Sequence, residues 1–163
     1  MHLSSLQTPR LLLRPLEDAD IPALQALGSD PAVSRYTLWN TFRTRADVHA
    51  YLHAVRERQR EGTAIEWGIT ISNTLVGTVG LYSIHRVSLE ETAADLGYAV
   101  NRAWWGRGLA TEAAREVVSF GVRDLGLTCI YARAADENPS SIRVLEKAGF
   151  RRLPLPAENL KLK

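Results

Sequence analysis

The sequence has 163 residues, of which 45% are hydrophobic and 23% charged, and its formal net charge at pH 7 is +2. This length and composition predict one globular domain over residues 1–163 with a hydrophobic core of its own. The small charge excludes a strong attraction to nucleic acid or to an anionic membrane surface, and the lack of both a signal-peptide pattern and an apolar run of roughly 18 residues predicts a cytoplasmic protein.

The N-terminal part predicts a strand followed by short helical segments. Residues 11–16 form the first strand, and a helix follows with Asp18 as its cap and Gly28 at its end. Asp30–Pro31 then opens a further helical turn. Residues 36–42 form a loop with three aromatic side chains. This loop either covers a pocket or packs on the core as a flap.

A long helix is predicted between Thr44 and Gly62. Thr44 and Asp47 approximate a capping box, in which each side chain binds the backbone N–H of the other residue. The helix has an apolar stripe at helical spacing, made of Val48, Tyr51, Leu52 and Val55.

Two groups that resemble metal or reactive sites have simpler structural explanations. His49 and His53 lie four residues apart on this helix, within reach of one metal ion. Ala50 stands where the zincin pattern has Glu, and no third ligand follows, so we expect a solvated pair and no metal. Cys129 is the single cysteine, which excludes an internal disulfide, and its apolar neighbours predict a buried strand thiol.

Three connected antiparallel strands follow the long helix. Apolar side chains alternate along residues 64–71, and Ser72–Asn73 turns the chain back into residues 75–82. After a polar loop at residues 88–92, the third strand covers residues 94–100. It delivers the chain into a glycine-rich turn, Trp-Trp-Gly-Arg-Gly.

This glycine turn predicts an anion-binding site. Gly106 and Gly108 flank Arg107, so the backbone bends tightly and approaches a ligand without a Cβ in the way. A helix begins at Leu109, inside the turn, and its unpaired N–H groups and positive dipole end favour a phosphate. Glycines also bend ordinary strand-to-helix turns. A dinucleotide fingerprint is a further alternative, but Thr111 stands in place of its third glycine and the turn comes late in the chain.

The remaining chain predicts a parallel strand and a last helix. Residues 128–134 follow a helical crossover, which makes this strand parallel to the preceding one. Glu137–Ser141 opens a helix that ends at Gly149. Residues 150–153 start another strand, and residues 159–163 alternate as a short edge strand.

The order of these elements and motifs resembles the GNAT family of acetyl-CoA-dependent N-acetyltransferases. Trp-Trp-Gly-Arg-Gly-Leu-Ala-Thr-Glu-Ala and Glu-Asn-Pro-Ser-Ser-Ile-Arg-Val-Leu-Glu-Lys-Ala-Gly-Phe are similar to the branch that includes the ribosomal-protein N-terminal (alanine/serine) acetyltransferases. The likeness extends from the Arg-Leu-Leu-Leu-Arg-Pro-Leu opening to Phe150. Trp105 replaces the family's usual Gln or Arg, and the 13 residues after Phe150 are too few for the family's full final hairpin.

The resemblance implies an α/β (α+β) fold with a mixed, largely antiparallel central sheet of six to seven strands, flanked by about four helices, whose central parallel strands splay apart. It places the pyrophosphate of coenzyme A on the amides of the glycine turn, with Arg107 adding charge. It also places the pantetheine arm beside residues 98–100, paired with the backbone as an added strand, and within reach of Asn138. The implied coenzyme-A-binding residues are Tyr98, Ala99, Val100, Trp105, Gly106, Arg107, Gly108, Ala110, Thr111, Asn138 and Ser141.

The same resemblance implies that Ser141 lies near the sulfur as the acid for the leaving thiolate, although Asn138 and Ser141 would equally cap the last helix. Asp95, Glu66 and Glu91 lie in or beside the central strands, and each is a candidate general base or a surface residue. An α-amine with a pKa near 7.7–8 loses its proton more easily than lysine near 10.4, by about 3.4 kcal/mol. The lack of an obvious strong base therefore favours a protein N-terminus as acceptor.

We therefore expect an acyltransferase that takes acetyl-CoA as co-substrate, holds no metal, and moves acetyl directly to a primary amine, a protein N-terminal α-amine first of all. The alternatives are a polyamine or antibiotic acetyltransferase, a catalytically silent acyl-CoA-binding module, and a nucleotide-binding protein. We expect no nucleic acid and no membrane as partner. The chain acts as a monomer or as a homodimer whose second subunit completes the acceptor pocket.

Overall fold

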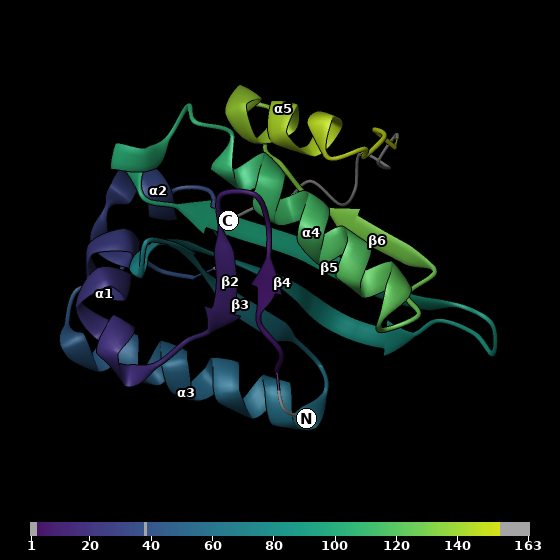
Figure 1. The fold of residues 1–163 in the computed structure, drawn as a ribbon, viewed down its shortest axis with the longest axis horizontal. Helices are drawn as coiled ribbons and strands as arrows, with labels where there is room; N and C mark the ends of the chain where they lie inside the picture. The colour runs from purple at the N-terminus through teal and green to yellow at the C-terminus, as the bar shows by residue number, and fades with distance from the viewer. Residues whose placement is uncertain (1–2, 38, 154–163) are drawn as a thin grey trace.

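A six-stranded sheet lies at the centre of the computed structural model, which describes residues 3–37 and 39–153 (Figure 1). The strands follow one another across the sheet in chain order, and every neighbouring pair is antiparallel except the last, which is parallel. This confirms the mixed, largely antiparallel sheet. The strands are β1 (Leu6–Gln7), β2 (Leu12–Pro15), β3 (Ile65–Ile71), β4 (Thr74–Arg86), β5 (Thr92–Val100) and β6 (Cys129–Ala132).

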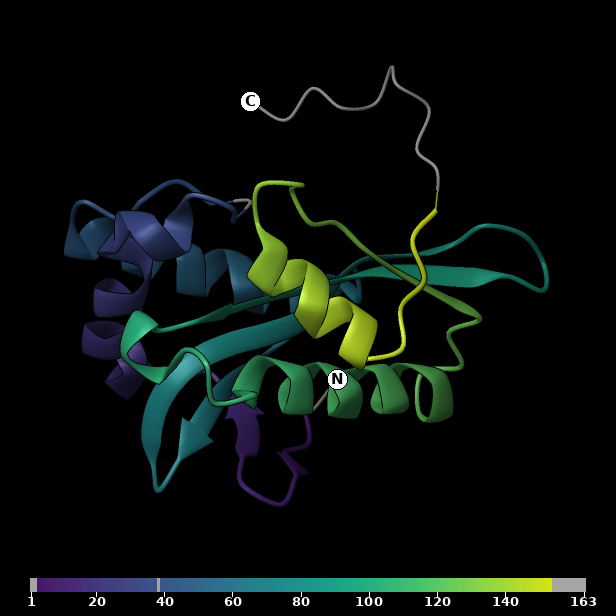
Figure 2. The same ribbon diagram turned by 90° about the horizontal axis from the view of Figure 1, so that it is seen from above.

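Helices cover both faces of the sheet (Figures 1 and 2). α4 lies across one face with α5 packed against it, whereas α1, α2 and α3 belong to the other side. No helix of the described ranges is long and apolar enough to cross a membrane. The helices are α1 (Ile21–Ser29), α2 (Pro31–Ser34), α3 (Arg45–Glu61), α4 (Leu109–Arg123) and α5 (Pro139–Lys147), with 3-10 helices at Asp18–Asp20 and Arg102–Trp104.

Successive side chains of β3 point to opposite faces of the sheet. Ile65, Trp67 and Ile69 are buried with the α4 side chains, and the Trp67 ring meets the Phe120 ring edge-on with 5.2 Å between centroids. Glu66, between two of these residues, points to the opposite face, where α3 lies. The expected alternation is thus confirmed, and it sends one carboxylate beneath α3.

The capping box at the start of α3 is confirmed. The Thr44 hydroxyl accepts a hydrogen bond from the Asp47 N–H at 3.3 Å, and Oδ2 of Asp47 accepts one from the Thr44 N–H at 2.8 Å. At the other end, Gly62 adopts a φ of 74°, and its N–H bonds to the last carbonyls of the helix. Both ends of α3 are therefore fixed by local chemistry.

Some expected boundaries are wrong. α1 continues one residue past Gly28, to Ser29, and the Phe42 ring packs where a Cβ on Gly28 would stand. Phe42 is buried in the core, whereas Tyr36, at the start of the aromatic loop, is exposed. Residues 150–153 form no strand, and the structure adds β1, which was not expected. The expected strand at 159–163 lies outside the described residues.

We predict that Thr44→Ala lowers the free energy of unfolding by about 0.5–2 kcal/mol, because the N–H of Asp47 loses its side-chain acceptor. Thr44→Ser keeps the hydroxyl and serves as the matched control, with a smaller loss. Urea denaturation followed by circular dichroism measures both variants. Equal losses in the two would show that the hydroxyl does not stabilise α3.

Candidate functional site

A groove of about 1990 Å³ runs beside the C-terminal part of β5. One wall comes from α3 and the loop before it, and the other from the glycine turn and α5. Its floor is formed by the central strands. The lining includes most of the residues expected at the site together with several aromatic ones: Tyr36, Trp39, Tyr51, Glu66, Tyr82, Asp95, Tyr98, Trp105, Gly108, Thr111, Asn138 and Ser141.

The two parallel strands separate beside this groove. β5 and β6 pair only as far as Leu96 and Ala132, whereas β5 continues to Val100. The backbone groups of successive residues in a strand point to opposite neighbours. The Thr92 carbonyl accepts a hydrogen bond from the Thr128 N–H, on the β6 side, and the Asn101 N–H donates to the Val76 carbonyl of β4. The backbone groups of the even-numbered residues of β5 therefore face the β6 side. Residues 97–100 therefore present an open edge, in agreement with the expected splay.

Part of this open edge has no hydrogen-bond partner. The indole Nε1 of Trp105 donates to the Val100 carbonyl at 2.6 Å. Within residues 3–37 and 39–153, no group pairs with the N–H or carbonyl of Tyr98 or with the N–H of Val100. These groups are suited to an extended ligand that pairs as an added strand.

The glycine turn leaves a row of backbone donors free. Gly106 and Gly108 both have a φ of 74°, and α4 begins at Leu109 with Gly108 as its cap and without a side-chain cap. Among the described residues, no acceptor meets the N–H groups of residues 106–111. The first turn of α4 therefore presents the donors and the positive dipole end that bind an anion.

Contacts of Arg10 and Arg107 hold the glycine turn in place, and the sequence did not predict them. The Arg107 guanidinium lies over the Trp104 ring, 4.7 Å from its centroid, and does not project into the mouth of the turn. Arg10 donates to the Arg107 carbonyl at 2.8 Å and pairs with Glu112 at 2.6 Å. Arg10 thus ties the N-terminal segment to α4.

Tyr98 and the start of α5 meet at the other wall. Asn138 caps α5, and its Oδ1 accepts a hydrogen bond from the Ser141 N–H at 3.2 Å. The Ser141 hydroxyl lies 2.7 Å from the Tyr98 hydroxyl. Burial raises the pKa of Tyr98, although the hydrogen bond to Ser141 lowers it in part. Ser141 therefore has a polar partner that the sequence did not reveal.

A buried carboxylate lies on the α3 side of the groove. Glu66 is only 2% exposed, and its Oε1 accepts a hydrogen bond from the Tyr51 hydroxyl. The Tyr82 hydroxyl lies over Gly80, which pairs in register with Glu66, so this phenol is on the same side of the sheet as the carboxylate. Burial raises the pKa of Glu66, although these two phenols lower it in part. A carboxyl whose pKa is raised in this way is poised closer to neutral pH as a proton acceptor.

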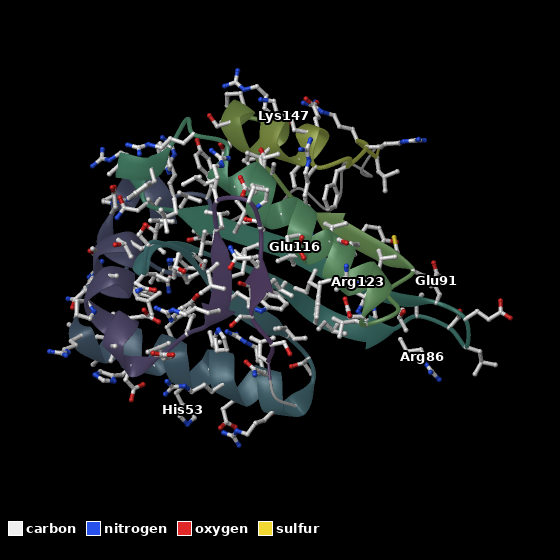
Figure 3. The ribbon with its side chains drawn as sticks, viewed as in Figure 1. His53, Arg86, Glu91, Glu116, Arg123 and Lys147 are labelled. Atoms are coloured by element: carbon white, nitrogen blue, oxygen red, sulfur yellow. The ribbon has the colours of Figure 1, made fainter. Side chains whose placement is uncertain are left out.

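The other candidate bases differ in position. Asp95 pairs in register with Tyr82 and lines the groove. Glu91 lies at the far end of the β4–β5 hairpin together with Arg86 (Figure 3) and does not line the groove, so the structure does not bring it together with the other two candidates.

The two histidines of α3 lie at the surface of the molecule. His53 projects outward from α3 (Figure 3) and lies 3.8 Å from Glu57, and His49 is exposed. In the part of the chain that the structure describes, no group of three metal-ligating side chains comes together.

The amino-acid sequence is similar to those of known acetyltransferases. A family model for the acetyltransferase (GNAT) domain matches residues 10–151. The N-acetyltransferase YoaA of Bacillus subtilis (strain 168) is 32% identical over 149 residues, which cover 90% of this chain and 82% of YoaA. The spermidine N(1)-acetyltransferase of Escherichia coli (strain K12) is 27% identical over 142 residues, covering 85% of this chain and 71% of that protein.

Solved structures share the fold. An acetyltransferase (GNAT family) from Bacillus anthracis superposes with a TM-score of 0.77 at 27% identity, covering 91% of this chain and 84% of that one. Mycobacterium smegmatis RimJ in complex with CoA-disulfide superposes with a TM-score of 0.81 at 21% identity, covering 93% of this chain and 76% of the RimJ chain. At that identity the RimJ likeness establishes the fold alone.

The raised pKa of Glu66 predicts a pH-dependent stability. A carboxyl with a folded pKa above its usual 4.5 stabilises the fold fully below that pH and loses this contribution as pH rises through the folded pKa. Gln does not titrate, so only the wild type loses this contribution. We therefore predict that the free energy of unfolding of the wild type falls relative to that of Glu66→Gln as pH increases from about 4.5. Urea denaturation over a pH series measures the difference. A difference that stays constant with pH would contradict the prediction.

Proposed function

The chain belongs to the GNAT family of acetyltransferases, and we propose that it transfers the acetyl group of acetyl-CoA directly to a protein N-terminal α-amine within a ternary complex. The free amides at the start of α4, together with the open edge of β5, are the observation that carries this proposal. We propose one acetyltransferase domain over residues 1–163. The cytoplasmic location and the choice between monomer and homodimer stay predictions.

The donor side of the groove suits coenzyme A. Its pyrophosphate would accept hydrogen bonds from the amides of residues 106–111. The Arg107 side chain lies over the Trp104 ring and therefore leaves these amides accessible. Its pantetheine amides would pair with the free backbone groups of Tyr98 and Val100. The Trp105 indole already occupies the Val100 carbonyl, so the pairing involves the remaining groups. Acetyl-CoA supplies the activated thioester.

The two walls of the groove provide an acid and a base. The Ser141 hydroxyl, hydrogen-bonded to Tyr98, would donate a proton to the leaving thiolate. Glu66 would accept the proton of the amine, because its raised pKa brings it closer to that of an α-amine, near 7.7–8. Asp95 is the second candidate for this role, since it also lines the groove.

The charge of the groove leaves both kinds of amine open. Arg35, Arg43 and Arg58 line the acceptor side, but so do the carboxylates Asp47, Glu66 and Asp95. The choice of a protein N-terminus therefore rests on the lower pKa of an α-amine, which loses its proton more easily than the amines of a polyamine. The spermidine-acetylating relative nevertheless keeps a polyamine as the second candidate.

We predict that coenzyme A binds at least about tenfold more tightly than pantetheine, which lacks the pyrophosphate, a difference of about 1.4 kcal/mol. Isothermal titration calorimetry measures both affinities. NAD is the control for a general nucleotide site. Equal binding of coenzyme A and pantetheine would show that the glycine turn does not hold the pyrophosphate. A melting temperature raised by NAD and not by coenzyme A would favour the nucleotide-binding alternative.

The proposed activity is tested by thiol release from acetyl-CoA with a panel of amines. The panel holds peptides with free N-terminal Ser, Ala or Met, the same peptides with N-terminal acetylation, spermidine and an aminoglycoside. We expect the free peptides to be acetylated and the blocked ones to be inert. Faster turnover of spermidine would assign the polyamine reaction. Tight acetyl-CoA binding with no turnover across the panel would indicate a silent binding module.

We predict that Glu66→Gln lowers kcat by about 10²–10⁴-fold, because general-base catalysis contributes a factor of this size. The affinity for coenzyme A should remain that of the wild type, since Glu66 lies on the acceptor side. Asp95→Asn is the matched comparison, with a smaller expected loss. A larger loss in Asp95→Asn than in Glu66→Gln would assign the base to Asp95.

A further inference from the structure

The burial of Glu66 poses a problem for a general base. Its carboxylate is 2% exposed and lies under α3, so an amine in the groove has almost no direct access to it. A general base must come within hydrogen-bond reach of the proton that it takes, or act through one intervening group. The Tyr51 hydroxyl donates to this carboxylate, the Tyr82 hydroxyl lies over Gly80 opposite Glu66, and both tyrosines line the groove.

Tyr82 lies in a slot formed by two glycines. Gly80 on β4 and Gly97 on β5 face each other in register. A Cβ on Gly97 would stand 2.9 Å from the Tyr82 ring, and a Cβ on Gly80 would stand 3.0 Å from the Tyr82 hydroxyl oxygen. The ring therefore lies flat over the two strands because neither residue has a side chain.

The slot places Tyr82 at the point where the strands separate. Leu96 is the last residue of β5 that pairs with β6, and Gly97 is the first residue of the open edge. The Tyr82 ring covers Gly97, while its hydroxyl lies over Gly80, the β4 residue that pairs in register with Glu66. Tyr82 thus connects the open edge, where the thioester is expected, to the buried carboxylate.

Tyr51 is held differently. It comes from α3, and its ring packs against Trp39 at 5.8 Å and Phe42 at 5.4 Å between centroids. Its hydroxyl donates to Oε1 of Glu66. This aromatic packing fixes the phenol, and the phenol fixes the orientation of the carboxylate.

We propose that Tyr82 relays the proton of the acceptor amine to Glu66, and that Tyr51 is a positioning residue that orients the Glu66 carboxylate. This inference rests on the proposed acetyl transfer. In the step, the ammonium proton passes to the Tyr82 hydroxyl oxygen while the Tyr82 proton passes to the Glu66 carboxylate. The amine lone pair is then free to attack the thioester carbonyl. Glu66 ends the step protonated, and Tyr82 is neutral before and after it.

The surroundings favour a concerted relay. Burial and the negative charge of Glu66 hold the pKa of Tyr82 well above its usual range, so a free phenolate is disfavoured and both transfers occur together. The charged and titratable groups that face Glu66 are Tyr51 and Arg58 from α3, Tyr82 from β4 and, beside Tyr82 in register, Asp95 from β5. Arg58 lowers the pKa of Glu66 and favours its carboxylate form.

Steady-state kinetics with the best peptide of the panel separates the two phenols. We expect Tyr82→Phe to lower kcat by about 10²-fold or more at every pH, because the relay hydroxyl is lost. We expect Tyr51→Phe to keep most of the plateau rate and to move the acid limb of the pH profile to higher pH, because the carboxylate loses a donor. Tyr131→Phe, an exposed tyrosine of β6 outside the groove, is the matched control and should behave as the wild type.

Gly97→Ala supplies a second variant with all hydroxyls intact. Its added Cβ would push the Tyr82 ring from the slot, so we expect a loss of kcat similar to that of Tyr82→Phe. Wild-type kcat in Tyr82→Phe, or equal losses without a pH shift in Tyr82→Phe and Tyr51→Phe, would overturn the relay. Thermal melting of each variant verifies that it folds.

A spectroscopic measurement keeps this inference separate from the proposed function. The ¹³C NMR signal of the Glu66 carboxyl, assigned by its loss in Glu66→Gln, is followed over pH without any substrate. We expect its titration to move to higher pH in both Tyr51→Phe and Tyr82→Phe. An unchanged titration in both variants would overturn the inference even if acetyl transfer is active. No turnover with any amine, together with the shifted titration, would instead reject the proposed function and leave the hydrogen-bonded cluster established.

Discussion

The hydrogen bonding between β5 and β6 stops at Leu96 and Ala132, and the rest of the site depends on that stop. β5 continues alone to Val100, which leaves backbone donors and acceptors along one edge without a strand to satisfy them. Unpaired backbone groups are costly when water is excluded, so a ligand that pairs with them recovers that cost. The same separation carries the chain away from β6 into α5, whose capped N-terminus forms the opposite wall of the groove.

The open edge also divides the chemistry between the two faces of the sheet. Tyr98 points to the α4 side and meets Ser141, whereas Glu66 and Tyr82 belong to the α3 side. In the proposed reaction the thiolate would leave toward one face and the amine would arrive from the other. Because the sheet stands between them, the proton donor and the proton acceptor cannot neutralise each other directly. This arrangement follows from the alternation of side chains along β5 and β3.

Local sequence signals predicted the parts of the fold that local chemistry decides. The capping box of α3, the helix start at Leu109 and the alternation of β3 each depend on residues a few positions apart, and all three are confirmed. The alternation also predicted that Glu66 and the apolar residues of β3 lie on different faces. A two-residue strand such as β1 is too short for any periodic pattern. Residues 150–153 have strand composition but pair with no strand among the residues that the structure describes.

The polar partners of the site could not be predicted in the same way. Tyr51 belongs to the apolar stripe of α3 by its spacing, and only tertiary packing brings its hydroxyl to Glu66. Tyr98 and Ser141 are 43 positions apart and meet only because β5 and α5 face one groove. Gly28 was assigned as a helix end, because sequence alone cannot distinguish a glycine that stops a helix from one that admits a neighbouring ring. The proposed roles of the site residues in binding and catalysis stay predictions.

The bond from the Trp105 indole to the Val100 carbonyl has a consequence beyond catalysis. An unpaired strand edge is a template on which another polypeptide adds itself, and such edges promote aggregation and fibril growth. In this protein the Trp105 indole occupies the last acceptor of the edge. A stray strand would therefore find one backbone partner fewer there than along a fully open edge.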